Sequence, residues 1–138
     1  MGAVQKSLRI PQRTFEEIER IARETGRDFS SVAKDLLAEA IKIRRCPGIV
    51  FADGVSGRRA RIAGTGLEVW EVISTHRSVD QEFSRLHKAY HWLTEQQLRA
   101  AIGYYTVYRQ EIDELIKLNE SWSRESATER LPFLTRNE

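Results

Sequence analysis

The sequence predicts a mainly helical chain with short β-elements, organised as two small units and a polar tail. Residues 4–10 alternate apolar and polar side chains, which is the period of a strand, although Lys6 interrupts the apolar face; apolar residues at helical spacing follow. Pro47-Gly48 is a boundary, because this pair interrupts regular structure. We therefore expect units at residues 1–46 and 47–119, and a flexible tail at residues 120–138.

Composition and charge narrow the class of protein. The chain has 138 residues, of which 41% are hydrophobic and 30% charged, as in an ordinary soluble protein of one or two small domains. No apolar stretch approaches the roughly 20 residues needed to span a bilayer, and the first ten residues lack the apolar core of a secretion signal. Because Cys46 is the only cysteine, an internal disulfide is excluded. We expect a cytoplasmic protein with no membrane partner.

The first unit is predicted to contain one strand and two amphipathic helices. Pro11 closes the strand, Gly26 is placed to cap the end of the first helix, and Asp28 is placed to cap the start of the second. A single strand has no ladder partner, and a core of about 45 residues is marginal. We therefore expect two chains to pair their strands antiparallel, with four helices beneath them.

The run KSLRIPQRTFEEIERIARETGRDFSSVAKDLLAEAI resembles, in order and without a gap, the ribbon-helix-helix family of DNA-binding proteins. The resemblance implies a β-α-α fold, an intertwined homodimer, and a strand face that enters the major groove of DNA. A two-stranded ribbon fits that groove, and every second side chain is able to reach base edges. That face carries Gln5, Ser7 and Arg9. Alternatively, these three residues are simply the solvated polar face of a strand.

Two further groups are candidates for contacts with DNA phosphates. The first group is the set of backbone N–H groups in the first turn of the second helix, at Phe29, Ser30 and Ser31. These N–H groups are able to hold a phosphate oxygen, although capping by Asp28 would use some of them. The second group is Arg58 and Arg59 on the predicted hairpin, which could contact DNA phosphates. Alternatively, these arginines form ion pairs with acidic residues inside the fold. For the neighbouring Arg61 we favour a structural role.

The second unit is predicted to be a β-hairpin followed by three helices. GIVFADGVSGRRARIAGT holds two β-prone runs separated by turn residues. The first helix is expected around residues 69–73. The second is expected to begin at a capping box, Ser78-x-x-Gln81, and the third to run from another capping box, Thr94-x-x-Gln97, to about Asn119.

Residues 49–118 resemble small helix-turn-helix domains of otherwise unknown function found in VapB-like antitoxins, through GRRARIAGTGLEVWEVI and LTEQQLRAAIGYYTVYRQEIDELI. Many members have Arg where this chain has Gly66, and Pro where it has Glu68, which weakens a basic contact at that loop. The resemblance implies the antitoxin of a type II toxin–antitoxin system, which neutralises a PIN-type ribonuclease toxin and represses its own operon by binding operator DNA. Whether this unit contacts DNA or joins two dimers is left open.

The tail, residues 120–138, lacks helical periodicity. It is either a frayed chain end or a segment that becomes ordered when it binds a partner. In the antitoxin interpretation, its large apolar groups fill grooves of the toxin, and one arginine enters the toxin's acidic site. The residues expected to bind the toxin are Trp122, Arg124, Arg130, Leu131, Phe133, Leu134 and Arg136.

The sequence predicts no catalytic residues, no cofactor and no metal site. His87 and His91 are four residues apart but lack a third ligand at a suitable spacing, and HExxH is absent. Cys46 has no evident base partner for nucleophilic chemistry. The alternatives to an antitoxin are a stand-alone ribbon-helix-helix transcriptional repressor without a toxin partner, and an interaction module that no longer binds DNA.

Overall fold

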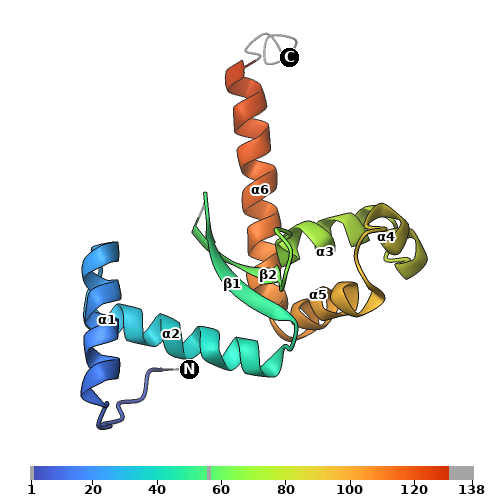
Figure 1. Cartoon of the computed structure of the whole chain (residues 1–138). Helices are drawn as coiled ribbons and strands as arrows, with labels where there is room; N and C mark the ends of the chain where they lie inside the picture. Colours follow the sequence, from blue (N-terminus) through green and yellow to red (C-terminus); the bar gives the residue numbers. More distant parts are fainter. Residues whose placement is uncertain (1, 56, 131–138) are drawn as a thin grey trace. The chain divides into compact units, whose positions relative to one another are not determined.

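The computed structural model of the chain describes residues 2–55 and 57–130, and for residues 125–130 it describes the backbone alone. It is mainly helical, with one antiparallel two-stranded sheet (Figure 1). The chain divides into two compact units, residues 1–44 and residues 45–138, called unit 1 and unit 2 below. No helix of the described part is both long enough and apolar enough to cross a membrane.

Unit 1 contains α1 (Gln12–Thr25) and α2 (Phe29–Arg45), and both predicted caps are confirmed. Gly26 adopts a left-handed conformation (φ 65°), and its N–H reaches the carbonyls of the last turn of α1. The Asp28 carboxylate accepts a hydrogen bond from the Ser31 N–H at 2.7 Å.

The strand predicted at residues 4–10 is not formed in the single chain. Val4 and Leu8, which the alternation assigned to a buried face, are 91% and 69% exposed. A strand needs a ladder partner, and the described residues of one chain offer none to this segment. The expectation that a second chain supplies that partner stays a prediction.

Unit 2 begins with the hairpin, which the structure confirms. β1 (Ile49–Gly54) pairs antiparallel with β2 (Gly57–Ile62), with Ile49 opposite Ile62 and Gly54 opposite Gly57. Four helices follow rather than three (Figure 1): α3 (Val69–Ser78), α4 (Phe83–Ala89), α5 (Glu95–Val107) and α6 (Arg109–Arg130). The hairpin packs against α3 and α5, and α6 packs against the same two helices.

Of the two capping boxes predicted in unit 2, one is confirmed and one is wrong. At the start of α5, the Gln97 N–H donates to Thr94 Oγ1 at 3.1 Å, and the Thr94 N–H donates to Gln97 Oε1 at 2.8 Å. Ser78, by contrast, ends α3 instead of opening a helix. The chain leaves α3 through Asp80 and Gln81, which both have left-handed backbones (φ 57° and 58°), so α4 starts only at Phe83.

The long helix predicted from residue 94 to about residue 119 is broken, and its second part is longer than expected. The backbone departs from helical geometry at Tyr108 (φ −118°, ψ 50°), and α6 begins at the next residue. The change of direction brings Ile112 and Ile116 into the core of unit 2. Residues 120–130, expected as a flexible tail, continue α6 to Arg130.

Candidate functional site

The described part of unit 1 exposes more large apolar side chains than it buries. Among its described residues only Ile18, Ala22 and Val32 are buried, with Phe29 packed against them. Along α2, Leu37 is 65% exposed and Ile41 is 56% exposed. The exposed apolar set of unit 1 comprises Val4, Leu8, Phe15, Ile21, Leu36, Leu37, Ile41 and Ile43. A group of exposed apolar side chains of this kind is typical of an interaction site.

The predicted base-reading residues lie on the segment that precedes α1. Gln5, Ser7 and Arg9 are all exposed, and their segment has no regular secondary structure in the single chain. The structure therefore places them together along one stretch of backbone but does not align them on a strand face. Alignment would require the ladder that a second chain supplies.

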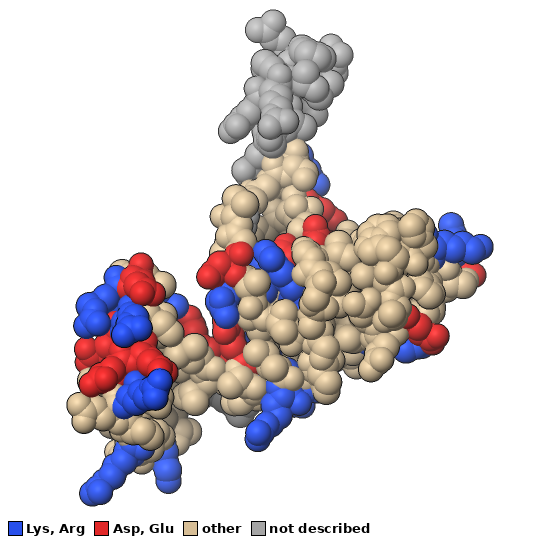
Figure 2. All heavy atoms as spheres, in the orientation of Figure 1, with Lys and Arg blue, Asp and Glu red and all other residues tan. Residues whose placement is uncertain are grey.

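The charges of α1 do not form a patch of one sign. Figure 2 shows basic and acidic side chains interleaved over this helix. Arg13 pairs with Glu17 at 3.5 Å and Arg23 pairs with Glu19 at 3.8 Å, both one helical turn apart. Exposed pairs of this kind contribute about 0–1 kcal/mol and leave little net charge. The face of α1 therefore offers no strong electrostatic attraction for DNA.

The first turn of α2 retains part of the predicted phosphate site. Ser31 already gives its N–H to Asp28, and this bond lowers the pKa of the Asp28 carboxyl below its ordinary value. Asp28 is therefore charged near neutral pH and would repel a phosphate approaching Ser31. In the described part of the chain, the N–H groups of Phe29 and Ser30 remain for such a contact, and the Ser30 side chain is exposed.

The hairpin arginines have different surroundings. Arg58 pairs with Asp53 across the turn at 3.5 Å, and Arg59 donates to the Arg58 carbonyl at 3.2 Å. Arg61 has a structural contact, as we favoured: its Nη2 donates to the carbonyl of Asp53 at 3.3 Å. Its Nε is buried and has no hydrogen-bond partner among the described residues.

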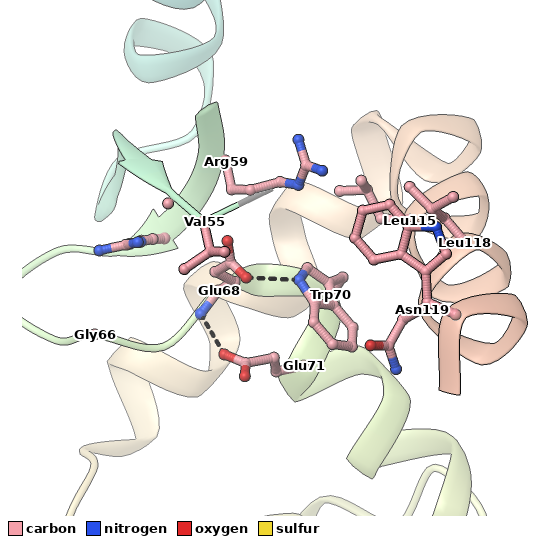
Figure 3. A pocket seen from close by; sticks show the side chains of 12 residues that line it. Val55, Arg59, Gly66, Glu68, Trp70, Glu71, Leu115, Leu118 and Asn119 are labelled. Atoms are coloured by element: carbon pink, nitrogen blue, oxygen red, sulfur yellow. Dashed lines mark hydrogen bonds between the residues drawn. The ribbon is translucent and has the colours of Figure 1, made fainter. Parts of the chain in front are cut away.

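A groove of about 250 Å³ lies in unit 2 between the hairpin, the start of α3 and the exposed side of α6. We call it the hairpin–α6 groove. In Figure 3, Arg59 extends from β2 toward Leu115 and Leu118 of α6, while Glu68 and Trp70 form another wall. The groove is lined by Gly54, Val55, Arg59, Arg61, Gly66, Glu68, Trp70, Glu71, Leu115, Leu118, Asn119 and Trp122.

The two carboxylates of this groove are held by hydrogen bonds that form the start of α3. Glu68 Oε2 accepts from Trp70 Nε1 at 2.8 Å, and Glu71 Oε2 accepts from the Glu68 N–H at 2.9 Å (Figure 3). Glu68 also accepts from the Glu71 N–H, which completes a capping box that the sequence reading missed. The glutamates thus shape the groove, whose lining is divided almost evenly between polar and apolar surface.

The outer part of α6 projects the first of the predicted toxin-binding residues. Residues 117–124 are all exposed, with Leu118 40% exposed and Trp122 49% exposed. Arg124 is exposed on the same helix, and the backbone of Arg130 ends it. The other predicted toxin-binding residues lie outside the described residues: Leu131, Phe133, Leu134 and Arg136.

A second cavity of about 550 Å³ opens beside α5 and reaches Cys46 and Tyr104. Burial raises the pKa of the Cys46 thiol, which disfavours the reactive thiolate. The pKa of Tyr104 is also raised, mainly by burial. The second cause is a 2.6 Å hydrogen bond that the Tyr104 hydroxyl donates to Glu111 Oε2. Both groups are therefore neutral near pH 7.

The histidines make contacts that belong to the fold. His87 Nε2 lies 2.9 Å from the Leu93 carbonyl, and His91 is exposed with its ring edge-on to Trp92. In the part of the chain that is described, no three or more His, Cys, Asp or Glu side chains are grouped to hold a metal ion.

One polar cluster that joins three helices was not predicted from the sequence. Arg77 of α3 pairs with Asp113 of α6, and the Arg77 guanidinium also donates to the Tyr105 hydroxyl of α5 at 2.8 Å. The Tyr105 hydroxyl donates to Asp113 at 2.9 Å. This bond, followed by the contact with Arg77, lowers the pKa of the Asp113 carboxyl. The three residues are 28 and 8 positions apart, so no local motif signals them.

Comparison with known proteins identifies one segment of unit 2. Residues 49–105 match the family described as Protein of unknown function (DUF433). No curated protein and no solved structure matches the chain. The DUF433 segment runs from β1 to within α5, so it includes the hairpin wall of the groove but not α6. Unit 1 also lies outside the DUF433 segment.

Proposed function

We propose that the chain is the antitoxin of a type II toxin–antitoxin pair, which binds operator DNA as a homodimer and captures a PIN-type ribonuclease toxin. The observation that carries the proposal is the exposed apolar set of unit 1. Three buried side chains hold α1 and α2 together, while eight large apolar side chains face solvent in the single chain. A second copy of unit 1 is the occupant that the proposal assigns to this surface.

Burial of the exposed apolar set supplies the free energy for that dimer. Burying one Leu or Ile side chain contributes about 1.5–3 kcal/mol. Leu37 and Ile41 lie one turn apart on α2, and Leu8 lies on the segment that would form the ribbon. Pairing residues 4–10 with the same residues of a second chain would satisfy their backbone groups and cover their apolar side together.

DNA binding follows from the same pairing. Once residues 4–10 form a ribbon, Gln5, Ser7 and Arg9 share the face opposite the apolar one. Arg is able to bond guanine bidentately and Gln is able to bond adenine, at about 1–3 kcal/mol of discrimination each. The N–H groups of Phe29 and Ser30 would add phosphate contacts that fix the register.

Toxin capture is assigned to α6 beyond its packed part and to the residues that follow. The exposed Trp122 supplies a large apolar anchor, and aromatic side chains of this kind dominate binding energy at protein interfaces. Arg124, Arg130 and Arg136 are candidates for the acidic site of a PIN-type nuclease, where an arginine would pair with metal-binding carboxylates.

The second candidate is a stand-alone repressor without a toxin. The 550 Å³ cavity beside α5, reached by Arg45 and Arg99, favours this alternative because it is large enough for a small effector. The two candidates share the dimer and the DNA contacts and differ in the role of α6.

The DNA assignment is tested by gel-shift titration of the DNA upstream of the coding sequence. We expect Arg9→Ala to lose sequence preference, with a cost of about 1–3 kcal/mol in specific binding. Arg20→Ala is the matched control, because it removes the same exposed side chain from α1 and is expected to leave specificity unchanged. A sequence-preferring shift that Arg9→Ala leaves unchanged would contradict the assignment.

Truncation separates the antitoxin from the stand-alone repressor. A chain ending at Asn119 keeps the packed part of α6, including Ile112 and Ile116. We expect it to bind DNA like the full chain but to lose capture of the co-expressed nuclease in a pull-down. Capture that survives this truncation would remove α6 and the residues after it from the toxin interface.

A further inference from the structure

The cavity of about 550 Å³ beside α5 is open to solvent and has a mostly apolar lining. Cys46 and Tyr104 are buried parts of that lining, whereas Val107, which also lines the cavity, is 44% exposed. All of its lining residues fall within residues 45–107, so unit 2 forms the cavity by itself. Its volume lies in the range of about 300–1,000 Å³ that is usual for small-molecule sites. Size and lining together fit a small molecule with an apolar body.

Small residues of α5 keep this space open. Ala100 and Gly103 line the cavity one helical turn apart. A Cβ at Gly103 would meet no described atom within 4 Å apart from its own helix, so packing of the described chain does not require glycine there. Glycine inside a helix is less stable than alanine. The chain thus leaves free, at some cost to α5, a space that a larger side chain would fill.

The charges that line the cavity favour an anion. Arg45 and Arg99 line it, and no Asp or Glu among the described residues does. Arg99 donates its Nε to Glu95 at 2.9 Å, so part of its charge is already compensated. Arg45 is exposed and forms no ion pair with the described part of the chain. Its guanidinium is therefore available to a carboxylate, whose two oxygens match its planar set of N–H donors.

We propose that the cavity beside α5 binds a small carboxylate with an apolar body, such as an aliphatic acid. The carboxylate pairs with Arg45, and the apolar body packs over Ala100 and Gly103. The mostly apolar lining favours this class over inorganic phosphate, which has no apolar part. For the stand-alone repressor, the second candidate function, this names the chemical class of the effector. The binding itself requires neither DNA nor a second copy, because unit 2 alone lines the cavity.

Titration of the full, isotopically labelled chain with octanoate tests the binding by NMR. The amide resonances of Gly48 and Gly103 are the reporters, because both residues line the cavity. We expect both resonances to shift and to saturate with octanoate, and octanol, an uncharged molecule of the same chain length, to bind more weakly. Resonances that stay in place at millimolar octanoate would overturn the proposal. Shifts confined to the exposed apolar set of unit 1 would place octanoate on that surface and would overturn it too.

A variant that fills the space gives a sharper test. Gly103→Leu places a side chain in the cavity and replaces glycine by a better helix former, so unit 2 should stay folded. We expect octanoate, followed at Gly48, to bind about tenfold more weakly because the alkyl chain loses buried contacts. Thr106→Leu is the matched control, because Thr106 is exposed on the same helix and does not line the cavity. Equal octanoate affinity in these two folded variants would overturn the proposal.

The pairing with Arg45 is tested by its charge. Arg45→Gln is expected to bind octanoate about threefold more weakly, which is the scale of an exposed charge contact, and to bind octanol like the parent chain. Arg44→Gln is the matched control, because Arg44 is adjacent and exposed but does not line the cavity. Equal losses in the two variants would reflect overall charge and contradict the pairing. None of these outcomes bears on toxin capture or DNA binding, which stay separate questions.

Discussion

Units 1 and 2 satisfy their apolar side chains in different ways. Unit 2 buries a continuous core that includes Ile49 and Ile62 of the hairpin and Val72, Leu98 and Ile112 of three helices. Unit 1 buries three residues of α1 and α2 in the described chain and exposes its larger apolar side chains. A unit that buries its own core is stable by itself, whereas one that exposes it depends on a partner. Under the proposed function, we therefore expect unit 2 to fold as a monomer and unit 1 to require association.

Truncation of the unit 2 core should give the largest effect. Leu98 is fully buried, so Leu98→Ala is expected to lower the free energy of unfolding of unit 2 by about 2–5 kcal/mol. Chemical denaturation at two protein concentrations measures this, and the loss should be the same at both. Leu37→Ala in unit 1 is the matched substitution, and its effect should grow as the protein is diluted. The comparison between the units would fail if both losses depended equally on concentration.

The buried hydroxyl of Tyr104 tests whether unit 2 also depends on specific polar contacts. Tyr104→Phe removes the hydrogen bond to Glu111 and is expected to cost about 1–3 kcal/mol, because the acceptor is charged. Thermal unfolding measures the loss, and Tyr105→Phe, which removes a half-buried hydroxyl, is a useful comparison. An unchanged melting temperature for Tyr104→Phe would show that the core is held by its apolar packing alone.

The smallest expected effect is a pH dependence from the Arg77–Tyr105–Asp113 cluster. The pKa of Asp113 is lowered in the folded chain, so its contribution to stability is complete above the ordinary carboxylate pKa and is lost as the pH falls through the folded value. Below about pH 4 the melting temperature of unit 2 should therefore fall more in the parent chain than in Asp113→Asn. Parallel pH profiles for the two chains would argue against this cluster as an acid-sensitive contact.

Local chemistry made part of this fold predictable from the sequence. Gly26, Asp28 and the Thr94–Gln97 pair each determine a helix end through hydrogen bonds with neighbours four or fewer residues away. The hairpin was predictable for the same reason, because turn residues separate two β-prone runs, although Asp53 and Gly54 end β1 as paired residues instead of forming the connection.

Features that depend on distant contacts were not predictable. Ser78 and Gln81 have the spacing of a capping box, yet Ser78 ends α3 and Gln81 has a left-handed backbone. The break at Tyr108 interrupts an apolar periodicity that continues on both sides of it. Likewise, the hairpin–α6 groove joins residues that are more than 50 positions apart, so no sequence motif marks it.

The most direct test of the account is the mass of the full chain in solution. Unit 1 should pair with a second copy at micromolar concentration, so sedimentation equilibrium should give twice the chain mass of 16.0 kDa. Leu37→Lys with Ile41→Lys should return the chain to 16.0 kDa while unit 2 stays folded. A parent chain that sediments as a folded 16.0 kDa species throughout this range would contradict the dimer, and with it the proposed binding of DNA.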